Sequence, residues 1–166
     1  MSTALTRYQS MRQVYETFRG GEINRKPCRN PAISNQCAVR MSLALYRSGF
    51  TFESFPHQAR IHHGRSICQL GDEPHLVGAN ELHSFLIRVW NPGIRGRGSD
   101  ILTQIQGRSG IIYFNNCFHR RSDPDGTNRG DHIDLWDGTQ IYNQILGVTD
   151  DGDNLFGRAD YVRFIA

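Results

Sequence analysis

Residues 35–50 read NQCAVRMSLALYRSGF, and this stretch predicts a helix that begins at a cysteine. Gly49 suits the position just after a helix, and apolar residues recur at helical spacing at Ala38, Met41 and Leu45. Ser34 or Asn35 can cap the helix by accepting a hydrogen bond from its first N–H groups. Cys37 then lies in the first turn, where free N–H groups and the helix dipole favour a thiolate. A core cysteine also fits this position, so the stretch alone allows a reactive or a structural thiol.

Apolar spacing predicts further helices in the first two thirds of the chain. One covers about residues 4–19, and another begins at residues 78–80. The inward positions expected for the second are Glu81, Leu82, Phe85, Leu86 and Val89. Residues 50–75 are expected to be irregular, and residues 101–106 to form a short helix or strand.

The last third of the chain has the pattern of an antiparallel sheet. GIIYFNNCF (110–118) predicts a buried strand, and ADYVRFIA (159–166) predicts the last one. DHIDLW (131–136) and TQIYNQIL (139–146) flank Asp137–Gly138, a two-residue hairpin signal. DPDGTNRGD (123–131) and DDGDN (150–154) are expected to be turns and not calcium loops. Helices first and strands later predict an α+β fold, with N-terminal helices packed on an antiparallel β-sheet.

Composition indicates an ordinary globular chain. Its 166 residues suit a single domain, 1–166, with 38% hydrophobic and 21% charged residues. No stretch approaches the roughly 20 apolar residues of a membrane span, and the N-terminus lacks the apolar block of a signal peptide. The net charge is only +3, and the basic residues, with Lys26 as the one lysine, are scattered. A nucleic-acid surface would be more basic and more concentrated, so neither nucleic acid nor membrane is an expected partner.

The cysteines at 28, 37, 68 and 117 show no CxxC spacing, which argues against a four-cysteine zinc site. His62–His63 with Cys68 also lacks a recognised ligand spacing, so no metal is expected. If one cysteine is a nucleophile, either one disulfide or none is compatible with the count. The pairing among Cys28, Cys68 and Cys117 stays open.

The hairpin suggests a base for the cysteine. If Asp137 and Gly138 are the two turn residues, His132 lies directly opposite Asn143, on the same face of the sheet. An imidazole beside a carboxamide is the His–Asn half of a Cys–His–Asn arrangement, in which the amide orients the ring. Trp136 shares this face, where it either lines a substrate site or packs as a hairpin aromatic. A surface histidine on a half-buried hairpin is the alternative interpretation of His132.

Taken in order, NQCAVRMSLAL, GIIYF and GDHIDLWDG resemble the type VI secretion amidase effectors, family four, over roughly residues 30–145. These are cysteine peptidases of the NlpC/P60 and papain-like type. The resemblance implies a toxin that needs no cofactor and cleaves the D-glutamyl–diaminopimelate bond of peptidoglycan stem peptides. It implies synthesis in the cytoplasm without a signal peptide and delivery by the type VI apparatus into the target-cell periplasm. A cognate immunity protein is the implied inhibitor.

The family triad carries over to Cys37 and His132. The third position, eleven residues beyond the histidine, is usually Asp in the family and is Asn143 here, with Asp134 or Asp137 as the fallback orienter. The segment between cysteine and histidine is longer than in the family, with IRGRG and HRRSDPDG as expected insertions. The backbone N–H of Cys37 is the expected oxyanion donor, and the second donor is not assigned.

Two other classes of function remain open on the sequence: a non-enzymatic binding module on a similar scaffold, and an RNA-binding protein. Alkylation by iodoacetamide separates them from an enzyme, in which one thiol is far more reactive than the others near neutral pH.

Overall fold

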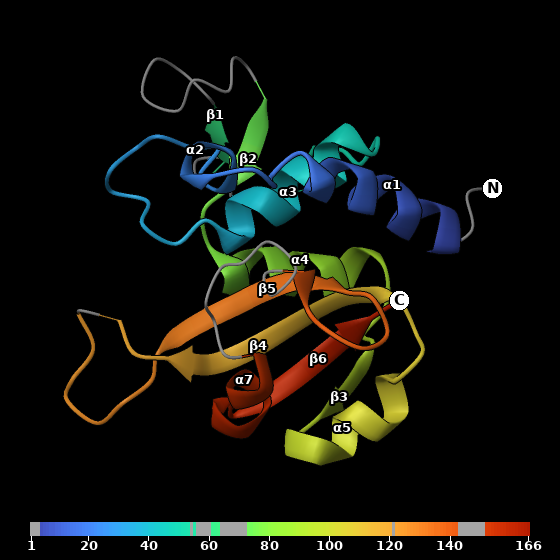
Figure 1. Cartoon of the computed structure of the whole chain (residues 1–166), viewed down its shortest axis with the longest axis vertical. Coiled ribbons are helices and arrows are strands. Elements are labelled where there is room, and N and C mark those ends of the chain that lie inside the picture. Colours follow the sequence, from blue (N-terminus) through green and yellow to red (C-terminus); the bar gives the residue numbers. More distant parts are fainter. Residues whose placement is uncertain (1–3, 54, 56–60, 64–72, 121, 143–151) are drawn as a thin grey trace. The chain divides into compact units, whose positions relative to one another are not determined.

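The computed structural model describes residues 4–53, 55, 61–63, 73–120, 122–142 and 152–166. The chain divides into two compact units, Met1–Leu82 and His83–Ala166 (Figure 1). In the described part, no helix is long and apolar enough to cross a membrane.

The first unit is built around one buried helix. Its elements are α1 (Ala4–Glu16), α2 (Glu22–Arg25), α3 (Cys37–Arg47) and the antiparallel pair β1 (Ile61–His63) and β2 (Pro74–Leu76). Every residue of α3 from Cys37 to Leu45 is buried, because α1 and β2 both pack against this helix. The predicted helix is therefore confirmed. It is the core of its unit and not an amphipathic surface helix.

Gly49 ends α3 as the spacing predicts. Its φ of 86° lies in the left-handed region that favours glycine. The N–H of Gly49 donates to Tyr46 O, and the N–H of Phe50 donates to Leu45 O. This pair of bonds is the Schellman arrangement, which satisfies carbonyls that the helix end would otherwise leave open.

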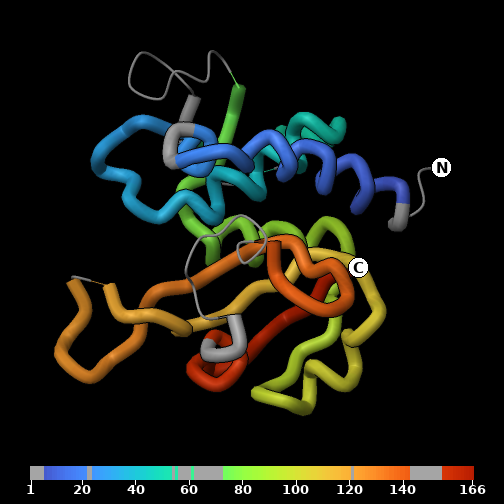
Figure 2. The backbone as a smooth tube through the Cα atoms, in the orientation of Figure 1, coloured from blue at the N-terminus to red at the C-terminus, as the bar shows by residue number. Residues whose placement is uncertain are grey.

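The second unit is a four-stranded antiparallel sheet with helices. Helix α4 (Ala79–Val89) enters it from the first unit. The other elements are β3 (Ile94–Gly96), α5 (Gly98–Ile105), β4 (Gly110–Phe118), β5 (Gly130–Trp136), α7 (Gly152–Arg158) and β6 (Tyr161–Ile165). The strand order is β3-β6-β4-β5, so the last strand of the chain lies between two earlier ones (Figure 2).

Helices cover both faces of this sheet. On one face, α5 and α7 enclose an apolar cluster whose main strand residues are Ile112, Phe114, Trp136, Val162 and Phe164. On the other face, His83 of α4 stacks on Tyr113 of β4, with ring centroids 3.9 Å apart. β5 is consequently buried on both sides, with burial continuous from His132 to Trp136.

Several elements differ from the sequence expectation. Residues 50–75 contain β1 and β2, which are too short for a periodic signal. Residues 152–158, expected in part as a turn, form α7. Of the expected short helix or strand at 101–106, residues 101–105 lie in helix α5, and Gln106 is its C-cap. Val89 is 40% exposed and does not face the core. The buried strand 110–118 and the last strand are confirmed.

The turn after β5 is longer than predicted. Trp136 bridges to Ile141, so four residues and not two connect them. The N–H of Asp137 donates to Gln140 O at 3.1 Å, and Asp137 Oδ1 accepts from the N–H groups of Thr139 and Gln140, both at 2.8 Å. The side chain of Asp137 thus stabilises a wider turn. The predicted two-residue turn is therefore wrong, and the predicted partner of His132, Asn143, lies outside the described residues.

Candidate active site

Cys37 is the first residue of α3 and carries a free thiol. It is 3% exposed. Its backbone N–H donates to Asn35 Oδ1 at 3.1 Å, which is the bond predicted for Asn35, although the N-cap position itself is held by Gln36. The same bond occupies the N–H that the sequence nominates as oxyanion donor.

Gln36, directly before Cys37, was not singled out from the sequence. Its Nε2 donates to Cys28 O at 2.9 Å and to Ile33 O at 2.7 Å, and its Oε1 accepts from Cys28 N–H at 3.1 Å. We call these three bonds the Gln36 clamp. They connect the start of α3 to the loop before it.

Two more polar side chains of the CAVRMS motif hold α3 in place. Arg40, 5% exposed, donates from Nη1 to Arg25 O at 2.7 Å. Ser42 Oγ accepts from the N–H of Leu76 at 2.9 Å and donates to Val39 O at 3.1 Å, which ties the helix to β2. Arg40 and Ser42 of the motif therefore serve to fix α3 in its unit.

A pocket of about 550 Å³ opens beside the start of α3. It is lined by Lys26, Cys28, Arg29, Asn30, Pro31, Ile33, Ser34 and Gln36. Two of these side chains are cationic and none is anionic. Such a lining favours a carboxylate-bearing ligand over a cationic one.

His132 lies in β5, at the edge of the four-stranded sheet. It is 2% exposed and pairs with Phe114 of β4, whose ring centroid is 6.2 Å from that of the imidazole. Its Nε2 lies 3.6 Å from Asp134 Oδ2. The alternative of a half-exposed surface histidine is therefore wrong.

A β-bulge lies next to His132. The pairing of β4 with β5 shifts between Phe114 and Phe118, and Asn116 has a φ of 51°. Asp131 Oδ1 accepts from the N–H of Asn116 at 2.9 Å and from Asn115 Nδ2 at 3.2 Å. Bulges often occur beside active sites, where they re-aim a side chain.

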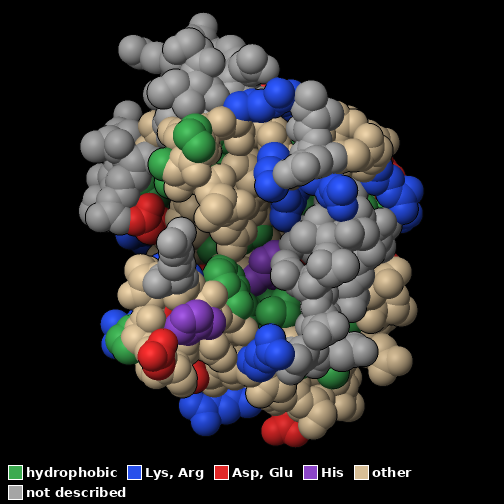
Figure 3. Space-filling model, turned by 60° about the vertical axis from the view of Figure 1, so that its left-hand side comes forward, with side chains coloured by type: hydrophobic (Ala, Val, Ile, Leu, Met, Phe, Trp, Pro, Cys, Tyr) green, Lys and Arg blue, Asp and Glu red, His purple; other side chains and the backbone are tan. Residues whose placement is uncertain are grey.

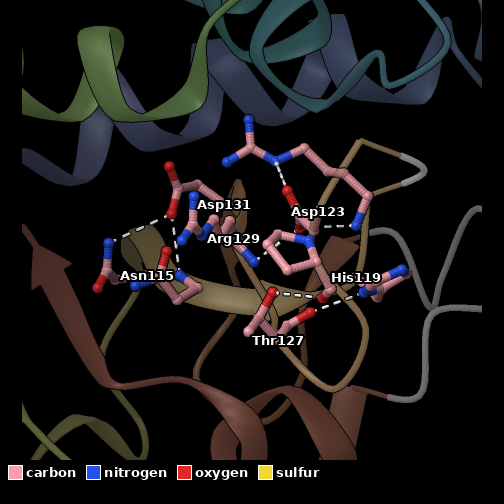
Figure 4. A network of polar contacts seen from close by, with 9 residues as sticks. Asn115, His119, Asp123, Thr127, Arg129 and Asp131 are labelled. Atoms are coloured by element: carbon pink, nitrogen blue, oxygen red, sulfur yellow. Dashed lines mark hydrogen bonds and ion pairs between the residues drawn. The ribbon is translucent and has the colours of Figure 1, made fainter.

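The loop that joins β4 to β5 is held by its own polar contacts (Figure 4). Asp123 Oδ2 accepts from the N–H groups of Arg120 and Arg129, both at 2.9 Å. His119 Nδ1 and Thr127 O are 2.7 Å apart. The expected turn at 123–131 is confirmed, and its carboxylate is used in closing the loop.

The three residues named as orienters have different outcomes. Asn143 lies outside the described residues. The carboxylate of Asp137 accepts hydrogen bonds within its own turn. Partial burial favours a higher pKa for this carboxyl, but the N–H groups of Gln140 and Thr139 outweigh burial, and the pKa is lowered. Asp134 is the fallback that lies beside His132, and its Oδ1 also accepts from the N–H of Leu135 at 2.8 Å.

Of the two roles expected for Trp136, the structure shows a packed aromatic side chain. It is 3% exposed, its Nε1 donates to Ile105 O at 3.2 Å, and its ring packs edge-to-face on Phe156. A substrate-lining role for Trp136 is not supported by this position.

The cysteines fall into two groups. Cys28 is disulfide-bonded, whereas Cys37 and Cys117 are free and buried. Cys68 lies outside the described residues, as do parts of the loops around it. Among the described residues, no group of three or more His, Cys, Asp or Glu side chains could hold a metal ion.

Basic side chains occupy several separate places on the face drawn in Figure 3, with acidic ones between them.

The helices of the first unit and the four-stranded antiparallel sheet of the second define an α+β protein. The family model of the type VI secretion system amidase effector protein 4, Tae4, matches residues 33–162. The chain belongs to this family. No curated protein sequence matched the chain significantly.

Solved structures of the family share the fold. The Tae4–Tai4 effector–immunity complex from Enterobacter cloacae matches with a TM-score of 0.60 and 17% identity, over 100% of this chain and 98% of that one. The effector–immunity system Tae4/Tai4 from Salmonella typhimurium gives 0.58 and 16%, over 98% and 96%. Tae4 from Enterobacter cloacae alone gives 0.56 and 20%, over 98% and 92%.

Family membership confirms the resemblance drawn from the sequence. The chain is an amidase effector, and hence a hydrolase, that a type VI secretion system delivers into target cells.

Proposed function

We propose that this chain is a cysteine amidase that hydrolyses the D-glutamyl–diaminopimelate bond of peptidoglycan stem peptides. Cys37 is its nucleophile and His132 its base. The observation that carries the proposal is a free cysteine at the first position of α3, in a member of an amidase effector family. The helix N-terminus supplies the field that a thiolate needs.

The reaction uses the cysteine and the histidine twice. His132 takes the proton of the Cys37 thiol, and the thiolate attacks the carbonyl carbon of the scissile amide. The protonated imidazole then gives its proton to the leaving amine, and an acyl-enzyme remains. Water, deprotonated by His132, attacks the acyl carbon and releases the new D-glutamyl carboxylate together with the thiol.

Asn143 is the proposed orienter of the imidazole, on the strength of its place in the family motif. Asp134 is its rival, because its carboxylate lies 3.6 Å from the ring. The N–H of Cys37 stabilises the oxyanion once Asn35 turns aside from it.

The pocket beside α3 is the proposed place for a carboxylate of the stem peptide. Gln36 lines the pocket and is covalently joined to Cys37, so a group bound there lies close to the nucleophile. Arg29 and Lys26 offer the charge, and Arg29 can bind a carboxylate in a bidentate manner.

Both units together form the proposed catalytic domain, 1–166. The proposed site of action is the periplasm of the target cell, where peptidoglycan lies. An immunity protein related to Tai4 is the proposed inhibitor, because solved relatives are complexes with Tai4.

Digestion of purified peptidoglycan, followed by mass spectrometry of the products, tests the activity. We expect fragments that end in a D-glutamyl carboxylate and fragments that begin with a diaminopimelate amine. Cys37→Ala should yield neither while its circular dichroism is unchanged. The matched control is Cys117→Ala, which removes the other free buried thiol. Cleavage by a folded Cys37→Ala protein would refute the proposal.

Expression in two compartments tests the site of action. A fused periplasmic signal peptide should cause lysis that depends on Cys37, whereas cytoplasmic expression should be tolerated. Equal toxicity in the cytoplasm would indicate a cytosolic target instead.

A further inference from the structure

The side chain of Gln36 makes hydrogen bonds to the loop 28–33. At 3% exposed it is essentially buried, and its amide group makes the three hydrogen bonds of the Gln36 clamp. Both amide hydrogens and the carbonyl oxygen are used. A buried amide that loses these partners leaves several backbone groups unsatisfied.

The backbone of Gln36 begins helix α3. Its carbonyl accepts the N–H of Arg40 at 2.9 Å, which is the first hydrogen bond of the helix. Gln36 is the N-cap residue, with φ and ψ of −105° and 7°, so its conformation decides where the helical turn begins. Because Cys37 follows directly, the clamp fixes the direction in which the Cys37 side chain leaves the helix.

The chemistry of the clamp requires an uncharged amide. Two of its partners are the carbonyls of Cys28 and Ile33, which need a donor. A glutamate would face both carbonyls with a negative charge. It would also place that charge beside the thiolate, where it opposes the helix dipole.

We propose that Gln36 is a positioning residue for the nucleophile: the Gln36 clamp holds the start of α3 so that Cys37 is reactive. This inference rests on the proposed role of Cys37. Gln36 also lines the pocket proposed for a substrate carboxylate, but its amide group is used by the clamp, so the role proposed here is through Cys37.

The test compares Gln36→Met, which keeps the length and removes the polar atoms, with Gln36→Glu, which keeps only the acceptor. Gln104→Met is the matched control, because Gln104 is exposed and its amide bonds only Asp100 O within its own helix among the described residues. For each protein we would measure iodoacetamide labelling of Cys37 against pH by peptide mass spectrometry, kcat and KM on a purified muropeptide, and the thermal midpoint.

Gln36→Met should lower kcat about 10- to 100-fold with little change in KM, since small displacements of a reacting group have effects of this size. The pH midpoint of Cys37 labelling should rise by about half a unit, because a displaced thiolate loses part of its stabilisation by the helix dipole. Gln36→Glu should raise the midpoint further, and Gln104→Met should match the wild type.

A folded Gln36→Met protein with the wild-type kcat and labelling midpoint would overturn the inference. If Gln36→Met does not fold, Gln36→Glu, which keeps the bond to the N–H of Cys28, decides by the same two readouts. Absence of hydrolysis by the wild type would refute the proposed function instead. The labelling profile would still show whether Gln36 controls Cys37.

Discussion

The two units hold the proposed nucleophile and the proposed base in different ways. In the first, Cys37 stands at the start of a helix whose beginning is set by side-chain bonds to the backbone from Gln36 and Asn35. In the second, His132 lies within a strand, and its position follows from the pairing with Phe114 and from the packing around it.

This contrast predicts which substitutions change the rate of the reaction and which also change the stability of the fold. A helix start can shift while the rest of the helix stays packed, so changes near Cys37 should act on the reaction more than on folding. β5 is an edge strand, but it is paired along its length with β4 and its residues from His132 to Trp136 are buried, so it cannot shift without disturbing that pairing and packing. Changes near His132 should therefore act on both.

Replacement of the histidine should have the largest effect. His132→Gln should lower kcat about 10³- to 10⁴-fold, the contribution of a general acid–base group at the upper end of its range. It should also lower the denaturant midpoint, because the site is buried. The control is His119→Gln in the exposed loop, which should keep full activity. Comparable activity in both variants would remove His132 from the mechanism.

Replacement of the residue that orients the His132 imidazole should have the next largest effect. Asn143→Ala should lower kcat by roughly 10- to 1000-fold with little change in KM, because orientation matters most during proton transfer. Asn143→Asp should keep much of the activity, since either side chain can accept from the ring N–H. An active Asn143→Ala protein beside an inactive but folded Asp134→Asn protein would transfer the role to Asp134.

Acid should weaken the second unit through His83. Burial first, and then the charges of Arg163 and Arg95, lower its pKa from 6.5 to about 4. As pH falls from 6.5 towards 4, the unfolded chain binds a proton that the folded chain refuses, so the free energy of unfolding falls, by at most about 3 kcal/mol. Neither ring nitrogen has a hydrogen-bond partner in the described part of the chain.

His83→Phe should remove this acid sensitivity, because phenylalanine can keep the stack on Tyr113 and has no proton to gain. Urea unfolding at pH 7 and pH 5 checks it, with His119→Gln as the control. An equal loss of stability in wild type and His83→Phe would show that other groups cause the acid response.

Arg29→Glu should give the smallest effect. Reversing an exposed charge in the pocket beside α3 should raise KM for a stem peptide by roughly 3- to 10-fold with kcat unchanged, as expected for an exposed ion pair. A substrate with its carboxylates amidated should not distinguish the variant from the wild type. Arg158→Glu, in α7, is the control for overall charge.

Periodic features were the predictable ones. The helix from Cys37 and the strand at 110–118 follow from apolar spacing and a terminal glycine. The helix at 152–158 was missed because DDGDN has the composition of a turn. The turn at Asp137 was misjudged because its carboxylate binds two backbone N–H groups and widens the turn, which residue type alone does not specify.

Cys37 and His132 stay predictions, because they follow from position and motif alone. The contacts that hold the start of α3 could not be predicted from the sequence. Gln36 gave no signal, because its bonds depend on how the loop 28–33 folds back, and no periodicity describes that. The bulge at Asn116 was equally hidden, since NN within a strand does not indicate a positive φ.

Because Cys28 is disulfide-bonded, the covalent state of the chain depends on the redox potential of the compartment that contains it. Disulfides persist in oxidising compartments and are reduced in the cytosol. If the chain is made in the cytosol and acts in the periplasm, as proposed above, Cys28 is a thiol before delivery and is cross-linked, next to the loop that meets α3, only after it. A sample purified with reductant then represents the proposed state in the producing cell, and a sample purified without it represents the proposed state at the destination.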